Sequence, residues 1–225
     1  MAEATVEKSA EQVVQKPAEA LLSKRRKKFI TDPLNDDNPI TVQVLGICSA
    51  LAVTVKMEPT LIMSISVICV IVLANLIISL LRNLIPNRVR IIVQLAVIAS
   101  LVTLVAEVLK AYNYPMYKVL GAFVGLIITN CIVMGRLEAF AMGNKPYDSI
   151  LDGLGNGLGY AWIILAVAFF RELLGSGSVF DFNVFASVGI PYVNNSLMVD
   201  PVGAFMILGL IIWAQRTKTG YVEHN

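Results

Sequence analysis

The chain has 225 residues, of which 56% are hydrophobic and 15% are charged, and its formal net charge at pH 7 is +2. Soluble domains carry about 25% charged residues, and the apolar residues here fall in long blocks. The composition therefore excludes disordered, fibrous and disulfide-stapled secreted classes and argues against a soluble enzyme. The single histidine, His224, lies beside the C-terminus, which removes most histidine-based metal and acid–base chemistry. We expect an integral membrane protein.

Residues 1–39 differ from the rest of the chain. They are polar, contain the basic run 24–28, and end in a turn-forming string around Pro33 and Pro39. A signal peptide would instead place its apolar stretch directly after the positive residues. We predict a solvated N-terminal tail over 1–39 that rests in part on anionic lipid headgroups. Because positive residues concentrate in this tail, the net charge gives no indication of nucleic-acid binding.

Six apolar blocks follow the tail. A helix needs about 20 residues to cross a hydrocarbon layer of ~30 Å at a rise of 1.5 Å per residue. The pattern predicts an all-α membrane protein with six transmembrane helices within 40–216 and a C-terminal tail over 217–225. We expect the first and fourth helices to be short or broken. The six blocks are residues 40–55, 60–81, 89–109, 117–135, 157–174 and 199–214.

The distribution of positive residues predicts the orientation of these helices. If the N-terminus is cytoplasmic, most of the Lys and Arg residues fall on the cytoplasmic side, even when the tail is left out. Cytoplasmic loops carry an excess of such residues. Both termini are therefore predicted to be cytoplasmic.

The two halves of the chain share a pattern. Arg82 ends the second block and Arg171 ends the fifth, and the block before each is short and holds one cysteine, Cys48 or Cys131. Two sets of three helices cross a membrane in opposite senses, as in inverted repeats. The similarity is weak by identity, so coincidence is the alternative explanation.

Cys48 and Cys131 form the candidate site. Both lie near the middle of the membrane, with glycine and small polar residues beside them that are typical of broken helices. Zinc and iron–sulfur centres normally need four ligands, so a second polypeptide or a second copy would have to supply two more. The alternative is that each free cysteine is a small, inert, buried side chain, as we expect for Cys69.

Other polar features point to packing. The glycines within 153–159 contain part of a dinucleotide-binding pattern, but no strand precedes them, so we expect close helix contact. Arg82 and Arg171 are expected to reach the membrane interface, with a Na+ gate as the alternative. Asn75 and Asn130 are expected to bridge helices rather than to bind Na+.

A resemblance covers about residues 38–216 and includes both candidate cysteines. Its longest runs are residues 43–54, 89–94, 125–136, 152–160 and 170–175, and residues 82–83 and 85–87 match as well. These runs resemble the family of D subunits of the Na+-translocating NADH:quinone oxidoreductase. That enzyme is a complex of six subunits in the bacterial inner membrane, and it passes electrons from NADH to ubiquinone and pumps Na+. The charged tail before Asn38 falls outside the resemblance.

The resemblance implies a subunit of a translocase that has no catalytic site of its own and works with subunits A, B, C, E and F. It implies that Cys48 and Cys131 ligate a 2Fe-2S cluster whose other two thiolates come from the E subunit, and that Cys69 is not a ligand. Electrons would pass from the F subunit, which carries FAD and a 2Fe-2S cluster, to the FMN of the C subunit.

Two alternatives are open. The E subunit of the Rnf complex, which couples ferredoxin:NAD electron transfer to ion transport, is homologous. It typically has Cys-Pro where this chain has Cys48-Ser49, and it lacks the 152–160 string. The second alternative is a non-redox transporter module in which inverted halves move against each other and the cysteines only fill space.

Overall fold

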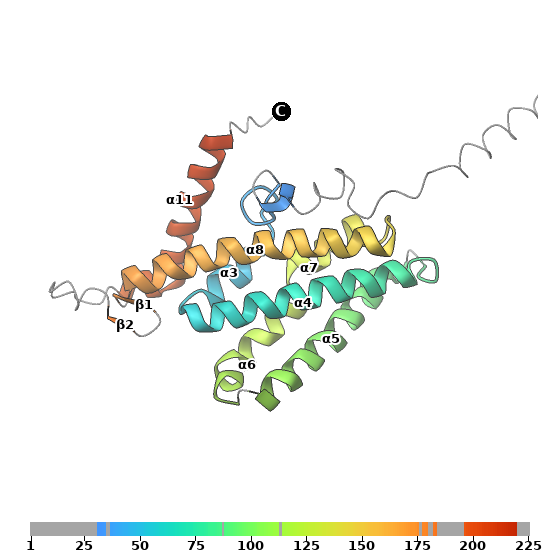
Figure 1. The fold of residues 1–225 in the computed structure, drawn as a ribbon, viewed down its shortest axis with the longest axis horizontal. Helices are drawn as coiled ribbons and strands as arrows, with labels where there is room; N and C mark the ends of the chain where they lie inside the picture. The colour runs from blue at the N-terminus through green and yellow to red at the C-terminus, as the bar shows by residue number, and fades with distance from the viewer. Residues whose placement is uncertain are drawn as a thin grey trace, which may run out of the picture.

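The computed structural model describes residues 31–34, 37–86, 88–112, 114–175, 177–179, 182–183 and 196–219. The described residues are almost entirely helical (Figure 1). The elements in chain order are η1 (Asp32–Leu34), α3 (Ile47–Val53), α4 (Met57–Leu81), α5 (Arg90–Tyr112), α6 (Tyr114–Ile128), α7 (Cys131–Arg136), η2 (Leu137–Ala141), α8 (Pro146–Gly175), β1 (Ser178–Val179), β2 (Phe182–Asn183), α10 (Ser196–Val199) and α11 (Pro201–Thr219).

Within the ranges that the structure describes, four helical segments are long and apolar enough to cross a membrane: Met57–Leu81, Arg90–Tyr112, Phe123–Ala141 and Pro146–Gly175. A shorter apolar helix follows over Pro201–Thr217. The only strands within the described residues are β1 and β2, which form one short antiparallel pair. The predicted all-α class with several apolar helices is therefore confirmed.

Helices α4 and α8 pack along each other and form the centre of the fold (Figure 1). Two glycines of α8 make this close approach possible. A Cβ atom added at Gly157 would lie 3.0 Å from Ile68 Cγ1, and one at Gly153 would lie 3.3 Å from Val72 Cα. The expectation that these glycines serve helix packing is confirmed, because small residues let helix backbones approach in a membrane.

The start of α8 differs from the predicted block. The block 157–174 places the glycine-rich string at the opening of a helix, whereas α8 already begins at Pro146 and contains the whole string. Glycine lowers helix propensity in isolation, but the contact with α4 keeps this stretch helical. The predicted boundary was wrong for that reason.

The first and fourth blocks contain interrupted helices. Within 40–55 only the seven residues of α3 are helical, and the preceding backbone includes Val44 at φ 58° and Gly46 at φ 80°. The fourth block is divided at residues 129–130, between α6 and α7. The sequence expectation of short or broken helices at these two places agrees with the structure.

The segment before α3 packs against α8 rather than extending into solvent. Pro33, Asn38 and Pro39 are buried, and Asn38 Nδ2 donates a hydrogen bond of 3.1 Å to the carbonyl oxygen of Gly159. The expectation of a solvated tail up to residue 39 was therefore wrong for this last part, and residues 1–30 lie outside the described part of the chain. At the other end α11 continues to Thr219, three residues beyond the predicted block 40–216.

Candidate functional site

The two candidate cysteines lie at the starts of the two interrupted helices. Cys48 is the second residue of α3 and is exposed, and Cys131 is the first residue of α7 and is partly exposed. The Asn130 side chain caps α7 by accepting a hydrogen bond of 3.4 Å from the Ile132 amide. Asn is a favoured N-cap residue, so the break in the fourth block is encoded next to the cysteine.

A hydrogen bond joins the two cysteine-bearing segments. The Gly46 amide donates to Cys131 Sγ over 2.9 Å, although the two residues are 85 positions apart in the chain. Gly46 adopts the left-handed conformation that L-residues rarely occupy. The break before α3 therefore frees a backbone amide and brings it to the sulfur at the start of α7.

A buried polar network lies beside this hydrogen bond. Ser49 Oγ is 2.7 Å from Tyr160 Oη and accepts a hydrogen bond of 3.2 Å from Asn130 Nδ2. Ser49 Oγ also donates to the Gly46 carbonyl oxygen over 2.9 Å. A hydroxyl has one proton and two lone pairs, so Ser49 accepts from Tyr160 as well and its hydrogen-bonding capacity is filled. The expectation that Asn130 bridges helices is confirmed.

Arg171 fixes the other end of α3. It is 1% exposed, and its Nη1 atom donates to Thr54 Oγ1 over 2.9 Å and to the Leu51 carbonyl oxygen over 3.2 Å. Its remaining donors bond the carbonyl oxygens at the start of the C-terminal helical segment, those of Met198, Val199 and Asp200. The expectation that this guanidinium reaches the interface was wrong, because backbone carbonyls inside the protein satisfy it.

An ion pair holds the far end of α7. Arg136 bonds the Asp152 carboxylate with both Nε and Nη2, the Nε contact being 3.0 Å, and both side chains are largely buried. Asn156 Nδ2 donates to Asp152 Oδ1 over 3.1 Å. The short helix that begins with Cys131 is thus tied to α8 at its C-terminal end.

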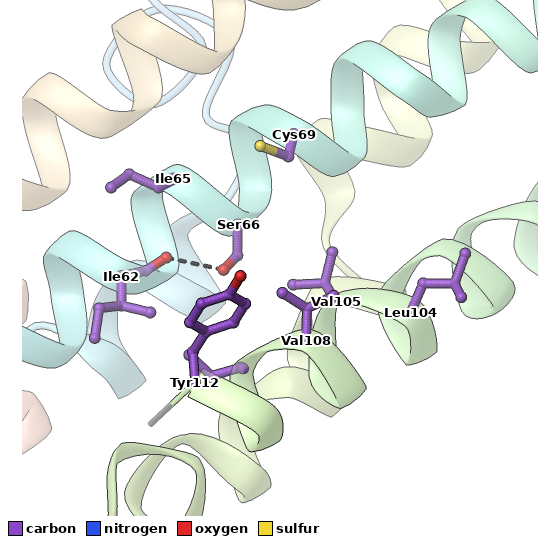
Figure 2. Close-up of a pocket in the computed structure, with 9 residues that line it drawn as sticks. Ile62, Ile65, Ser66, Cys69, Leu104, Val105, Val108 and Tyr112 are labelled. Atoms are coloured by element: carbon purple, nitrogen blue, oxygen red, sulfur yellow. Dashed lines mark hydrogen bonds between the residues drawn. The ribbon is translucent and has the colours of Figure 1, made fainter. Parts of the chain in front are cut away.

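Cys69 is exposed, so the expectation that it is a buried side chain was wrong. It faces an apolar groove of about 400 Å³ between α4 and α5, and Figure 2 shows Tyr112 of α5 opposite Ser66 of α4 in this groove. Ser66 Oγ donates to the Ile62 carbonyl oxygen over 2.9 Å. Neither Cys48 nor Cys131 lines the groove.

Within the part of the chain that the structure describes, no group of three or more His, Cys, Asp or Glu residues is placed to hold a metal ion. Among the described residues, no further cysteine, histidine or carboxylate is therefore placed with Cys48 and Cys131 to complete a metal site.

Comparison with known proteins identifies the family. Residues 26–212 match the family described as "Rnf-Nqr subunit, membrane protein". The chain belongs to the Rnf-Nqr family. It is 55% identical over 204 residues to the D subunit of the Na(+)-translocating NADH-quinone reductase of Pasteurella multocida (strain Pm70), covering 89% of this chain and 98% of that protein. It is 54% identical over 193 residues to the protein of the same name from Haemophilus influenzae (strain PittGG), covering 85% and 93%. The resemblance to this family of D subunits is confirmed.

Sequence reasoning missed the contacts that two residues make beside the candidate cysteines. Tyr160 entered only as the last residue of the 152–160 string, and Arg171 entered as a marker of the repeat and as an interfacial cation, with a Na+ gate as the alternative. A signal for Tyr160 was present, because Asp152, Asn156 and Tyr160 recur every four residues and so share one face of α8. No local signal existed for Arg171, whose carbonyl partners lie 27 to 120 positions away.

Proposed function

We propose that the chain is the D subunit of a Na+-translocating NADH:ubiquinone reductase of a bacterial inner membrane. The support is that its sequence is 55% and 54% identical to two proteins named as this D subunit, over 98% and 93% of their lengths. In this role it transfers electrons, has no catalytic site of its own and works beside subunits A, B, C, E and F in membrane lipid. It stands between the F subunit, which carries FAD and a 2Fe-2S cluster, and the FMN of the C subunit.

Cys48 and Cys131 are the proposed ligands of a 2Fe-2S cluster that two further thiolates of the E subunit would complete. The observation that carries this assignment is the hydrogen bond from the Gly46 amide to Cys131 Sγ. Backbone N–H groups that bond cysteine sulfur are one means by which proteins set the potential of iron–sulfur centres. The exposure of Cys48 also supports the assignment, because a shared site needs a thiol that a second polypeptide can reach. A bound 2Fe-2S cluster supplies one-electron transfer there.

The chain's own residues have separate tasks in this proposal. The Gly46 amide stabilises negative charge on the Cys131 sulfur. Asn130 and Ser49 hold the two interrupted helices together, and Arg171 fixes the end of α3. Ile132 and Val133, which directly follow Cys131, are fully buried and anchor the start of α7 in the core.

The proposed topology has six transmembrane helices arranged as two inverted repeats of three, with both termini in the cytoplasm. Two features support the repeat: α3 and the α6–α7 pair are interrupted at corresponding places, and each interruption adjoins a cysteine. Discontinuous helices at corresponding positions of two halves are typical of inverted-repeat membrane proteins.

The test is the iron content of the purified complex carrying single cysteine substitutions. Cys48→Ala and Cys131→Ala are expected to abolish bound iron and acid-labile sulfide at this site and NADH-driven quinone reduction. Cys69→Ser is the matched control and should leave both nearly unchanged. Unchanged iron and activity in the Cys48→Ala complex would eliminate the redox role and favour the non-redox transporter module.

A further inference from the structure

Tyr160 is one of the largest fully buried side chains among the described residues, and it lies between the two cysteine-bearing segments. A buried phenol hydroxyl needs a hydrogen-bond partner, most of all where the surroundings are apolar. The partner here is Ser49 Oγ at 2.7 Å. Ser49 directly follows Cys48, so the phenol is bonded to the residue beside one candidate ligand.

The same hydroxyl group of Ser49 also bonds the residue beside the second candidate ligand. Asn130, which directly precedes Cys131, donates to Ser49 Oγ over 3.2 Å. Both Ser49 and Asn130 are buried, at 2% and 4% exposed. Tyr160, Ser49 and Asn130 therefore form one chain of hydrogen bonds that ends next to each of the two cysteines.

The ring of Tyr160 acts at a third point. A Cβ atom added at Gly46 would lie 3.0 Å from Tyr160 Cε2, so the ring lies against the Gly46 backbone. Gly46 is the residue whose amide bonds Cys131 Sγ. The ring thus limits how far this amide can move from the sulfur.

Tyr160 is itself held rigidly. It belongs to α8, whose Gly153 and Gly157 are in close contact with α4. One turn earlier, Asn156 bonds Asp152, which is paired with Arg136 of α7. Because α8 is fixed in this way, Tyr160 holds Ser49 and Gly46, which it contacts, in defined positions.

We propose that Tyr160 is the positioning residue of the thiol site, and that its hydroxyl and ring keep the Gly46 amide on the Cys131 sulfur and hold the Cys48 and Cys131 segments in register. The inference rests on the proposed function, because its consequence is measured on the iron–sulfur centre. Tyr160 contacts Ser49 through its hydroxyl and Gly46 through its ring, so its effect is exerted through these two residues.

The test uses the purified complex with Tyr160→Phe, which removes one oxygen atom and keeps the ring. Loss of the phenol hydroxyl leaves Ser49 Oγ with an unfilled acceptor position, and we expect Ser49 and Asn130 to rearrange. Iron content should stay at the wild-type level. The midpoint potential of the centre and its electron paramagnetic resonance spectrum should both change, because the amide-to-sulfur contact changes.

Matched variants distinguish a specific effect of Tyr160 on the thiol site from a general loss of structure. Tyr112→Phe removes the same atom from an exposed tyrosine of α5 and should leave the potential and spectrum unchanged. Ser49→Ala should reproduce the effect of Tyr160→Phe. Ser49→Thr keeps the hydroxyl and should restore the wild-type potential.

The outcomes distinguish this inference from the proposed function. A Tyr160→Phe complex with wild-type iron, potential and spectrum overturns the positioning role and leaves the cluster assignment intact. If the Tyr160→Phe complex does not assemble, the midpoint potentials of the Ser49→Ala and Ser49→Thr complexes are compared instead. Equal potentials in these two complexes overturn the inference. An iron content that stays at the wild-type level when Cys48 and Cys131 are replaced overturns the proposed function itself, because only the iron of the F subunit should then remain.

Discussion

The amide nitrogen of Gly46 lies 2.9 Å from the sulfur of Cys131, so the residue just before one interrupted helix hydrogen-bonds the first residue of the other. This contact depends on the backbone of Gly46, whose φ of 80° no ordinary L-residue adopts without strain. A glycine at position 46 is therefore needed for a contact with a residue 85 positions away.

Gly46→Ala should destabilise the protein. The left-handed conformation costs an L-residue about 1–2 kcal/mol, and the new methyl group would press on the Tyr160 ring. We expect a lower thermal midpoint for the purified complex and faster loss of iron to a chelator. Differential scanning fluorimetry and iron release over time measure the two effects.

Gly125→Ala is the control for that experiment. Gly125 lies in α6, where nothing is within 4 Å of an added Cβ atom. A helical Gly→Ala change at an open position is neutral or stabilising by about 0.4–1 kcal/mol. A Gly46→Ala complex as stable as the Gly125→Ala complex would contradict the strain attributed to Gly46.

Arg171→Met should weaken the junction between α3, α8 and α10. The substitution removes the guanidinium hydrogen bonds to the Leu51 and Val199 carbonyl oxygens, and each hydrogen bond to a charged group contributes about 1.5–3 kcal/mol. Arg171→Lys keeps the charge but loses the planar fork, so it should rescue only in part. The amount of folded protein in membranes and its thermal midpoint report the loss.

The comparison variant for Arg171 is Arg88→Met, in the turn between α4 and α5, where the side chain is exposed. It should change the thermal midpoint little, since surface substitutions usually stay within about 0.5 kcal/mol. Equal behaviour of the two arginine variants would show that the buried guanidinium does not hold this junction.

The Arg136–Asp152 pair should show strong coupling in a double-mutant cycle. Removing one partner leaves the other buried and unpaired, which costs about 3–5 kcal/mol. Replacing both, as in Arg136→Met with Asp152→Leu, should recover much of the lost stability. Thermal midpoints of the two single variants and the double variant give the coupling, and additive losses would mean that the two side chains act independently.

The predicted orientation is tested with reporter fusions to the full chain. A green fluorescent protein joined after residue 225 should fluoresce, because it folds in the cytoplasm, and alkaline phosphatase at the same position should be inactive. Active phosphatase at the C-terminus would reverse the orientation that the positive residues indicate.

The interruptions of the helices were predictable from sequence because their causes are local. Gly46 supplies a left-handed turn, and Asn130 supplies an N-cap. Apolar blocks on both sides of each break show where helix resumes. Gly46 and Asn130 therefore indicate, from sequence alone, where the helices that carry Cys48 and Cys131 begin.

The remaining features depend on contacts between distant segments. The start of α8 at Pro146 was missed because glycine disfavours a helix when only the local sequence is considered. The contact with α4 that stabilises these glycines in a helix is not visible in the sequence. The burial of Arg171 was missed because its acceptors are backbone carbonyls, which no side-chain pattern reveals. Tyr160 was missed because its partner Ser49 is 111 residues away.

The most direct test of the central claim is a density map of the assembled complex with anomalous scattering recorded at the iron edge. We predict an iron signal between Cys48 and Cys131 on this chain and two thiols on the neighbouring polypeptide, and its disappearance in the Cys131→Ala complex. Two cysteines packed among apolar side chains, with no iron signal between them in the wild-type complex, would contradict the claim.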